Sequence, residues 1–242
     1  DVTELAKTLT GWTIGDYRNA SDETGRTIFL ERAHEPGVRS VLGVTYPADG
    51  PGQIKAVLKD ICRREGTAQN VAFKLARHFT SDIPPEDLVR DLKQTFLQTD
   101  GDLTLVYSTL IESEHVWRRQ PQKLKSPEEL LTSTARLLGT KLVFTGAPKN
   151  VYESLGQRPF HAPTPQGWPD TQQDWLDPNA LMKRIEWANR VAGRADEVDA
   201  RQLLENALGP LASEAARVEV SDAETRSQAI SVALMSPGFQ MR

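Results

Sequence analysis

The chain has 242 residues, a formal net charge of −4 and 38% hydrophobic residues. A chain of this length buries roughly 70–75% of the surface that it exposes when unfolded, so it can build a core without disulfides or metals. The acidic balance argues against a nucleic-acid binder or a protein that binds anionic membranes, since both present a surplus of basic residues. Cys62 is the only cysteine, which excludes an intrachain disulfide and a thiolate metal cluster. No apolar run approaches the ~18 residues that a membrane-spanning helix needs.

Strand signals are confined to the first fifth of the chain. We expect one small β-hairpin within residues 27–46, because two β-branched and apolar stretches there flank a Glu-Pro-Gly turn at 35–37. Residues 1–10 carry apolar side chains on one helical stripe, which predicts a helix at the start of the sequence. The turn-rich residues 15–25 between these two elements are expected to form a loop.

From residue 51 onward, apolar side chains recur at intervals of about 3.6 residues, which is typical of amphipathic helices packed on a common core. The strongest start signal combines Ser126 as the cap, Pro127 at the first helical position and Glu129 reaching back to the cap. We predict a mainly α chain that folds as one compact multi-helix domain over residues 1–242. Helices are expected at 54–61, 68–79, 84–96, 103–111, 126–139, 150–155 and 177–192, around 203–204, and at 221–235.

Residues 156–178 interrupt the helical pattern with a long loop rich in proline and aromatic residues. Its five prolines stiffen the backbone, and its rings alternate with amide, guanidinium and carboxylate groups. Such an arrangement suits a sugar- or peptide-binding site, since rings pack on apolar faces while polar groups fix the orientation. The alternative is that the rings pack under the loop as its own core, which we expect above all for Trp168. The candidate ligand-binding residues are Gln157, Phe160, His161, Trp168 and Trp175 in the loop and Asn189 on the following helix.

The motifs of the common enzyme classes do not occur in the sequence. It contains no phosphate-binding glycine loop, HExxH, CxxC or GxSxG motif, and it indicates no cofactor. The junction of loop and helix offers His161, Asp170 and Arg184 as catalytic candidates, which could share general acid–base work if they converge. The structural alternative is that Arg184 bridges Asp170 or Asp174, and that the amide of Asn189 bonds to the backbone of the preceding loop.

The pair His34-Glu35 at the expected hairpin turn is the weak candidate for a metal site. A carboxylate beside an imidazole can orient the ring or bind a metal ion together with it. Turn residues are commonly only solvated, so no metal site is assigned on sequence grounds.

Seven segments spread along the whole chain carry a resemblance to one protein family. They are DVTELAKTLTGW, HEPGVRSVLG, NVAFKLARHFTSDIPP, KLKSPEELL, LGQRPFHAPTPQGWPD, WLDPNALMKRIEWAN and LMSPGFQ. Their order and spacing resemble the domain of unknown function 1800 proteins, a large bacterial group. The segments correspond to the C-terminal portion of such proteins, which carry a further helical region before it.

The resemblance implies a location and partners rather than a reaction. Proteins of this family look exported, often behind a twin-arginine or general secretory signal, which implies a periplasmic or secreted protein. They often accompany a secreted sulfatase-like protein, so this companion and the N-terminal region are the implied partners. The sequence itself begins at Asp1 and shows no signal peptide. The family usually has His-Asp at the hairpin turn, and the longer carboxylate of Glu35 in this chain disfavours tight metal geometry.

The sequence and the resemblance lead to three functional hypotheses. The first is a binding or assembly module of the cell envelope, with a ligand or partner surface at 156–178. The second is a hydrolase that acts on an envelope or extracellular polymer through His161, Asp170 and Arg184. The third is a structural fragment whose function lies in the region that precedes Asp1.

Overall fold

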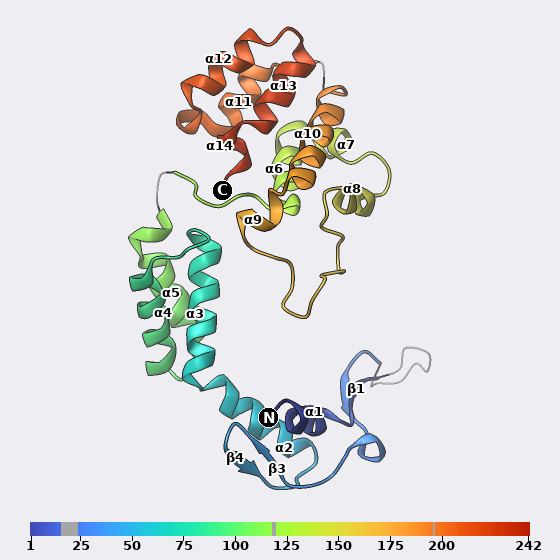
Figure 1. The fold of residues 1–242 in the computed structure, drawn as a ribbon, viewed down its shortest axis with the longest axis vertical. Coiled ribbons are helices and arrows are strands. Elements are labelled where there is room, and N and C mark those ends of the chain that lie inside the picture. The colour runs from blue at the N-terminus through green and yellow to red at the C-terminus, as the bar shows by residue number, and fades with distance from the viewer. Residues whose placement is uncertain (16–23, 118–119, 196) are drawn as a thin grey trace. The chain divides into compact units, whose positions relative to one another are not determined.

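The computed structural model describes residues 1–15, 24–117, 120–195 and 197–242. Within these residues the chain is mainly α, with 14 α-helices and two small antiparallel strand pairs (Figure 1), which confirms the predicted fold class. The described helices include none long and apolar enough to cross a membrane. Contacts group the chain into two compact units, which are described separately below. That residues 1–242 fold as one domain stays a prediction.

The first unit comprises residues 1–73 and 89–111. Its small core holds Val41, Tyr46 and Val57, and the Tyr46 hydroxyl donates a 2.6 Å hydrogen bond to the carboxylate of Asp60. This bond ties the last strand to the helix that follows it. The elements are α1 (Val2–Leu9), β1 (Trp12–Ile14), β2 (Thr27–Phe29), the 3-10 turn η1 (Glu31–Ala33), β3 (Arg39–Val41), β4 (Val44–Tyr46), α2 (Pro51–Cys62), parts of α3 (Glu65–Phe79) and α4 (Glu86–Gln98), and α5 (Leu103–Glu112).

The single hairpin expected within residues 27–46 is wrong in its pairing. Strand β2 pairs with β1, which places Trp12 opposite Phe29, while β3 and β4 pair only with each other. The rings of Trp12 and Phe29 meet edge to face with centroids 5.5 Å apart, so this contact gives β2 an apolar partner earlier in the chain. The expected loop at 15–25 includes residues 16–23, which lie outside the described residues.

The β3–β4 hairpin turns at Leu42-Gly43 rather than at 35–37. Leu42 has φ 50° and Gly43 has φ 80°, as a two-residue type I′ loop requires. The Leu42 amide donates to Asp1 Oδ1 at 2.7 Å, and its carbonyl accepts from Arg64 at 2.9 Å. Sequence patterns do not predict this turn, because its first loop position holds leucine, whereas asparagine or glycine usually indicates a turn of this type.

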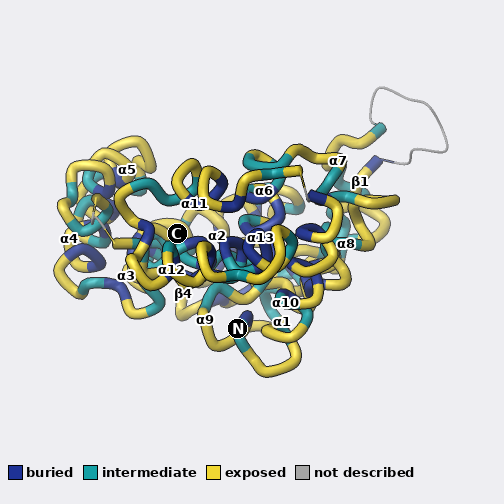
Figure 2. The backbone as a smooth tube through the Cα atoms, turned by 90° about the horizontal axis from the view of Figure 1, so that it is seen from above, coloured by how far each residue is buried: buried dark blue, intermediate teal, exposed yellow. Residues whose placement is uncertain are grey.

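The second unit comprises residues 74–88 and 112–242. Its core lies around α13, whose residues Ile230, Ala233 and Leu234 are buried (Figure 2) against α10, α11 and α12. The complete elements of this unit are η2 (Glu114–Trp117), α6 (Pro127–Leu138), α7 (Thr140–Val143), α8 (Pro148–Ser154), α9 (Gln172–Trp175), α10 (Pro178–Ala192), α11 (Ala200–Leu208), η3 (Gly209–Leu211), α12 (Glu214–Asp222), α13 (Arg226–Met235) and α14 (Pro237–Gln240).

Helix starts in this unit follow the capping signals of the sequence in most places. The capping box of α6 is confirmed, since Ser126 Oγ accepts from the Glu129 amide at 3.3 Å and Glu129 accepts from the Ser126 amide at 2.8 Å. The helix expected at 221–235 begins later than predicted, because residues 221 and 222 end α12 and Thr225 caps α13 by accepting from the Gln228 amide at 3.1 Å. The expected loop at 156–178 also contains a short helix, α9.

The left-handed turn at Leu42 gives a test of the β3–β4 hairpin. The change Leu42→Asn is expected to raise the free energy of unfolding by about 1 kcal/mol, because asparagine adopts positive φ at lower cost than leucine. Urea denaturation of the purified chain measures this difference. Val38→Asn is the matched control, since Val38 is also exposed but has no positive φ, and it should bring no gain. Equal effects of the two changes would contradict the turn assignment.

Candidate functional site

The start of the 156–178 loop is fixed to helix α6 by a buried amide. Gln157 is 7% exposed, and its side-chain oxygen accepts a hydrogen bond of 2.8 Å from the backbone amide of Glu128. Its own backbone amide donates to the Tyr152 carbonyl at 3.0 Å. The first turn of a helix has amides without intrahelical partners, so Gln157 satisfies one of them from outside. The loop therefore leaves α8 in a fixed direction.

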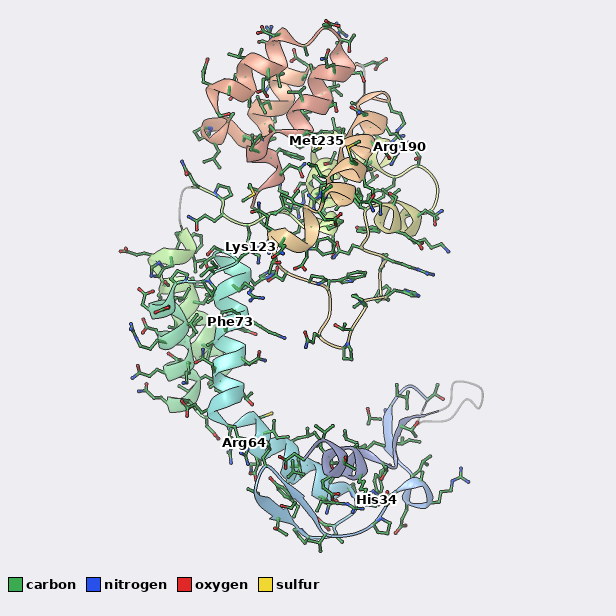
Figure 3. The ribbon with its side chains drawn as sticks, viewed as in Figure 1. His34, Arg64, Phe73, Lys123, Arg190 and Met235 are labelled. Carbon is green, nitrogen blue, oxygen red and sulfur yellow. The ribbon has the colours of Figure 1, made fainter. Side chains whose placement is uncertain are left out.

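The far end of the loop is held by a buried ammonium group. Lys123, labelled in Figure 3, is 3% exposed. Its Nζ lies 3.2 Å from Asp82 Oδ1 and 3.0 Å from Asp170 Oδ1. It also donates to the Asp170 carbonyl at 2.6 Å, and Asp82 accepts from the Gln172 amide at 2.6 Å. A buried charge is tolerated when it is paired and fully hydrogen-bonded, as here. Asp170, a candidate catalytic residue, is thus one of the groups that fix the loop.

Two tryptophans form the base of the loop. Trp175 is 7% exposed, and its indole N–H donates to the Pro169 carbonyl at 3.1 Å. The half-buried ring of Trp168 lies against it, with ring centroids 6.3 Å apart. Trp175 therefore belongs to the core of the loop, as the alternative reading of the rings expects, whereas Trp168 also faces a pocket.

A pocket of about 260 Å³ opens beside the loop, and we call it the aromatic pocket. Of the described residues that line it, three are aromatic, from α8 and from two places in the loop, and one is charged, from the first turn of α6. The sequence prediction included half of these residues. The pocket is lined by Glu128, Tyr152, Gln157, Pro159, Phe160 and Trp168.

Phe160 is the most unusual of the lining residues. Its side chain is fully exposed, and its backbone has φ 60° in the left-handed region. That conformation costs a residue with a side chain about 1–2 kcal/mol, and the exposed ring recovers none of it by burial. An exposed aromatic ring held in a strained conformation at a pocket is a reason to look for a binding role.

Tyr152 reports the electrostatics inside the aromatic pocket. It stacks on Phe144 with ring centroids 5.9 Å apart, so its ring is fixed by helix packing. Burial raises the pKa of the Tyr152 phenol, and the negative charge of Glu128 raises it further. The negative charge of the Glu128 carboxylate therefore acts on a side chain that lines the pocket. Sequence patterns do not reveal that these two residues line a pocket, since Glu128 belongs to a helix start and Tyr152 to a short helix.

Arg184 and Asn189 point away from the aromatic pocket. Arg184 is 2% exposed and donates to Gln240 Oε1 and to the Lys125 carbonyl, both at 2.8 Å. Burial lowers the pKa of its guanidinium to about 10. Asn189 accepts from the Ser231 hydroxyl at 2.6 Å. The bridges expected from these two residues to the loop are wrong, because this side of α10 faces α13 and α14.

The three catalytic candidates have separate partners in the described part of the chain. His161 is exposed, and its Nδ1 lies 2.9 Å from the Pro159 carbonyl. Asp170 pairs with Lys123, and Arg184 is enclosed by neutral acceptors. No hydrogen bond joins any two of the three among the described residues. Their joint catalytic role stays a prediction.

The candidate metal pair in the first unit is engaged by other groups (Figure 3). His34 Nδ1 lies 3.0 Å from the Thr10 carbonyl and its ring contacts Phe29, while Glu35 pairs with Arg39 at 3.3 Å and Lys7 at 3.5 Å. Among the residues that the structure describes, no three His, Cys, Asp or Glu side chains come together to hold a metal ion.

The fold and the site define a mainly α protein with an aromatic pocket beside a proline-rich loop. Residues 1–241 match the family described as "Protein of unknown function (DUF1800)", and the chain belongs to this family. The family resemblance seen in the sequence is therefore confirmed. No curated protein and no solved structure matches the chain.

The buried guanidinium of Arg184 yields a prediction about stability. Arg184→Ala should lower the free energy of unfolding by about 2–4 kcal/mol, because it opens a cavity and leaves two buried acceptors without donors. Urea denaturation monitored by circular dichroism measures the loss. Arg190→Ala is the control on the same helix (Figure 3), where an exposed arginine lies 3.9 Å from Glu186. It should change the free energy by less than about 0.5 kcal/mol. Similar losses for both variants would contradict this account.

Phe160 should be dispensable for folding. Phe160→Gly removes a strained conformation worth about 1–2 kcal/mol and adds a glycine entropy cost of about 0.5–1 kcal/mol. We therefore expect the free energy of unfolding to stay within about 1 kcal/mol of the original value or to rise. Trp175→Ala, which truncates a buried ring, should instead lower it by about 3–5 kcal/mol. A loss above 2 kcal/mol for Phe160→Gly would show that the exposed ring supports the fold.

Proposed function

We propose that this chain is a binding module of the bacterial cell envelope whose aromatic pocket receives one small group of a ligand. The observation that carries the proposal is the fully exposed, left-handed Phe160 beside the half-buried Trp168 at the same pocket. Selection for stability alone would favour glycine or a polar residue at such a position. On this proposal, the ring serves a contact with a ligand outside the chain.

The size of the aromatic pocket limits what enters it. A volume of about 260 Å³ is at or below the low end of the range for drug-sized ligands, which is ~300–1,000 Å³. One sugar ring or one amino-acid side chain suits this volume, so the ligand is a small molecule or one projecting unit of a polymer.

The anchored ends of the loop support a binding role in energetic terms. Gln157 holds its start and Lys123 holds its end, so the rings are positioned before any ligand arrives. A site that is ordered in advance loses less conformational entropy on binding, which leaves more of the contact energy as affinity.

The cellular setting is part of the proposal and rests on the resemblance described above. The proposal sets the module in the periplasm or outside the cell, with a sulfatase-like companion and the N-terminal region as its partners. The acidic net charge supports a ligand other than nucleic acid.

Nuclear magnetic resonance of the nitrogen-15-labelled chain tests the binding role. The probes are glucose, N-acetylglucosamine, a lysine-containing tripeptide and choline, each titrated to millimolar concentration. We expect at least one probe to shift the Trp168 indole N–H and the backbone amides of Gln157, Arg158 and Phe160 in a saturable way. Phe160→Gly should weaken that binding at least fivefold, whereas His161→Ala, in the same loop but outside the pocket lining, should not. If no probe shifts these signals, or if Phe160→Gly binds like the original chain, the proposed function is wrong.

A further inference from the structure

The charge of the aromatic pocket indicates which class of ligand the pocket binds. Among the residues that the structure describes, Glu128 is the only charged residue of its lining, and no basic residue lines it. The oxygen of Gln157 is already occupied by the Glu128 amide, so the carboxylate is the strongest acceptor left for a ligand. The nearest arginine in the sequence, Arg158, lies outside the lining and reaches toward Glu153 at 4.0 Å.

The rings around this carboxylate add attraction of the same sign. The faces of Tyr152, Phe160 and Trp168 carry the negative side of their ring quadrupoles, which attracts a cation placed within about 6 Å of a ring centre. Several rings with a carboxylate form the type of cage that recognises ammonium groups. An anionic group would be repelled by the Glu128 carboxylate and by the ring faces.

From this lining we infer that the aromatic pocket selects an organic cation, specifically an alkylammonium group, over neutral and anionic ligands of the same shape. The inference rests on the proposed function, since it names the ligand class of the same pocket. It also assigns separate roles to the lining residues. Glu128 supplies the counter-charge, Phe160 and Trp168 supply ring faces, and Gln157 holds the carboxylate-bearing turn in place.

The Tyr152 phenol is influenced by the same carboxylate. The negative charge of Glu128 contributes to the raised pKa of the Tyr152 phenol, after burial as the larger cause. A field that disfavours a second negative charge on Tyr152 favours a positive one in the space between them. Glu128→Gln should therefore lower the pKa of Tyr152, which carbon-13 tyrosine signals follow during a pH titration.

The decisive experiment compares two probes of the same shape. Choline carries a permanent positive charge, and 3,3-dimethylbutan-1-ol replaces its nitrogen with carbon and is uncharged. We expect the chain to bind choline at least fivefold more tightly, followed through the Trp168 indole signal. Nα-acetyl-lysine methylamide, with a primary ammonium group, is the second cationic probe. A preference for it over choline identifies a lysine side chain as the source of the ammonium group, and the reverse preference identifies a quaternary one.

Two variants separate charge from shape. Glu128→Gln keeps the size of the side chain and should reduce choline affinity about tenfold, while Phe160→Leu keeps an apolar group without a ring face and should reduce it about threefold. Glu153→Gln is the matched control, since it removes a carboxylate that does not line the pocket, and its effect should stay below twofold. Circular dichroism of each variant verifies that it is folded.

The outcomes of this experiment distinguish the inference from the proposed function. Equal affinity for choline and 3,3-dimethylbutan-1-ol, or full choline affinity in Glu128→Gln, would overturn the cation preference. Saturable binding of a neutral sugar at the Trp168 signal without binding of either cation would overturn it as well and leave the binding module intact. If none of the probes binds, both the proposed function and this inference are wrong.

Discussion

The buried ammonium of Lys123 is the interaction on which the second unit most depends. Its backbone exchanges two hydrogen bonds with Arg242, of 3.2 and 2.7 Å, while its side chain meets Asp82 and Asp170. Three stretches that are distant in sequence therefore meet at one residue: the segment before α4, the end of the proline-rich loop and the last residues of the chain. A lone charge in this position would be costly, so each partner holds the others in place.

The aromatic pocket follows from that arrangement together with the bond between Gln157 and the α6 amide. Fixing both ends of a loop stiffened by prolines leaves little freedom for the rings between them. Trp175 is buried beneath the loop and contacts Trp168, while Trp168 and the exposed Phe160 line the pocket. The site thus arises from the way in which the loop is anchored, and the charge of Glu128 comes from a helix start that the sequence specifies strongly.

The sequence could predict what depends on neighbours along the chain. The capping box at Ser126 and Glu129 located α6, and the density of rings and prolines located the loop. It could not show contacts made across long separations. Glu128 and Tyr152 join the pocket only because Gln157 brings the loop to α6, and Arg184 bonds to Gln240, 56 positions later. The hairpin expected within residues 27–46 was wrong for the same reason, because β2 pairs through a contact of Phe29 with Trp12 earlier in the chain.

The contact between Trp168 and Trp175 has an optical consequence. Two indole rings whose centroids are 6.3 Å apart, at an angle of 43°, are close enough for their electronic transitions to couple. Coupled chromophores fixed in a chiral arrangement produce paired circular dichroism bands of opposite sign that vanish when the rings separate. One tryptophan of this pair faces the aromatic pocket and the other lies in the core of the loop. The chain therefore contains a built-in spectroscopic reporter of whether this loop is assembled, without any added label.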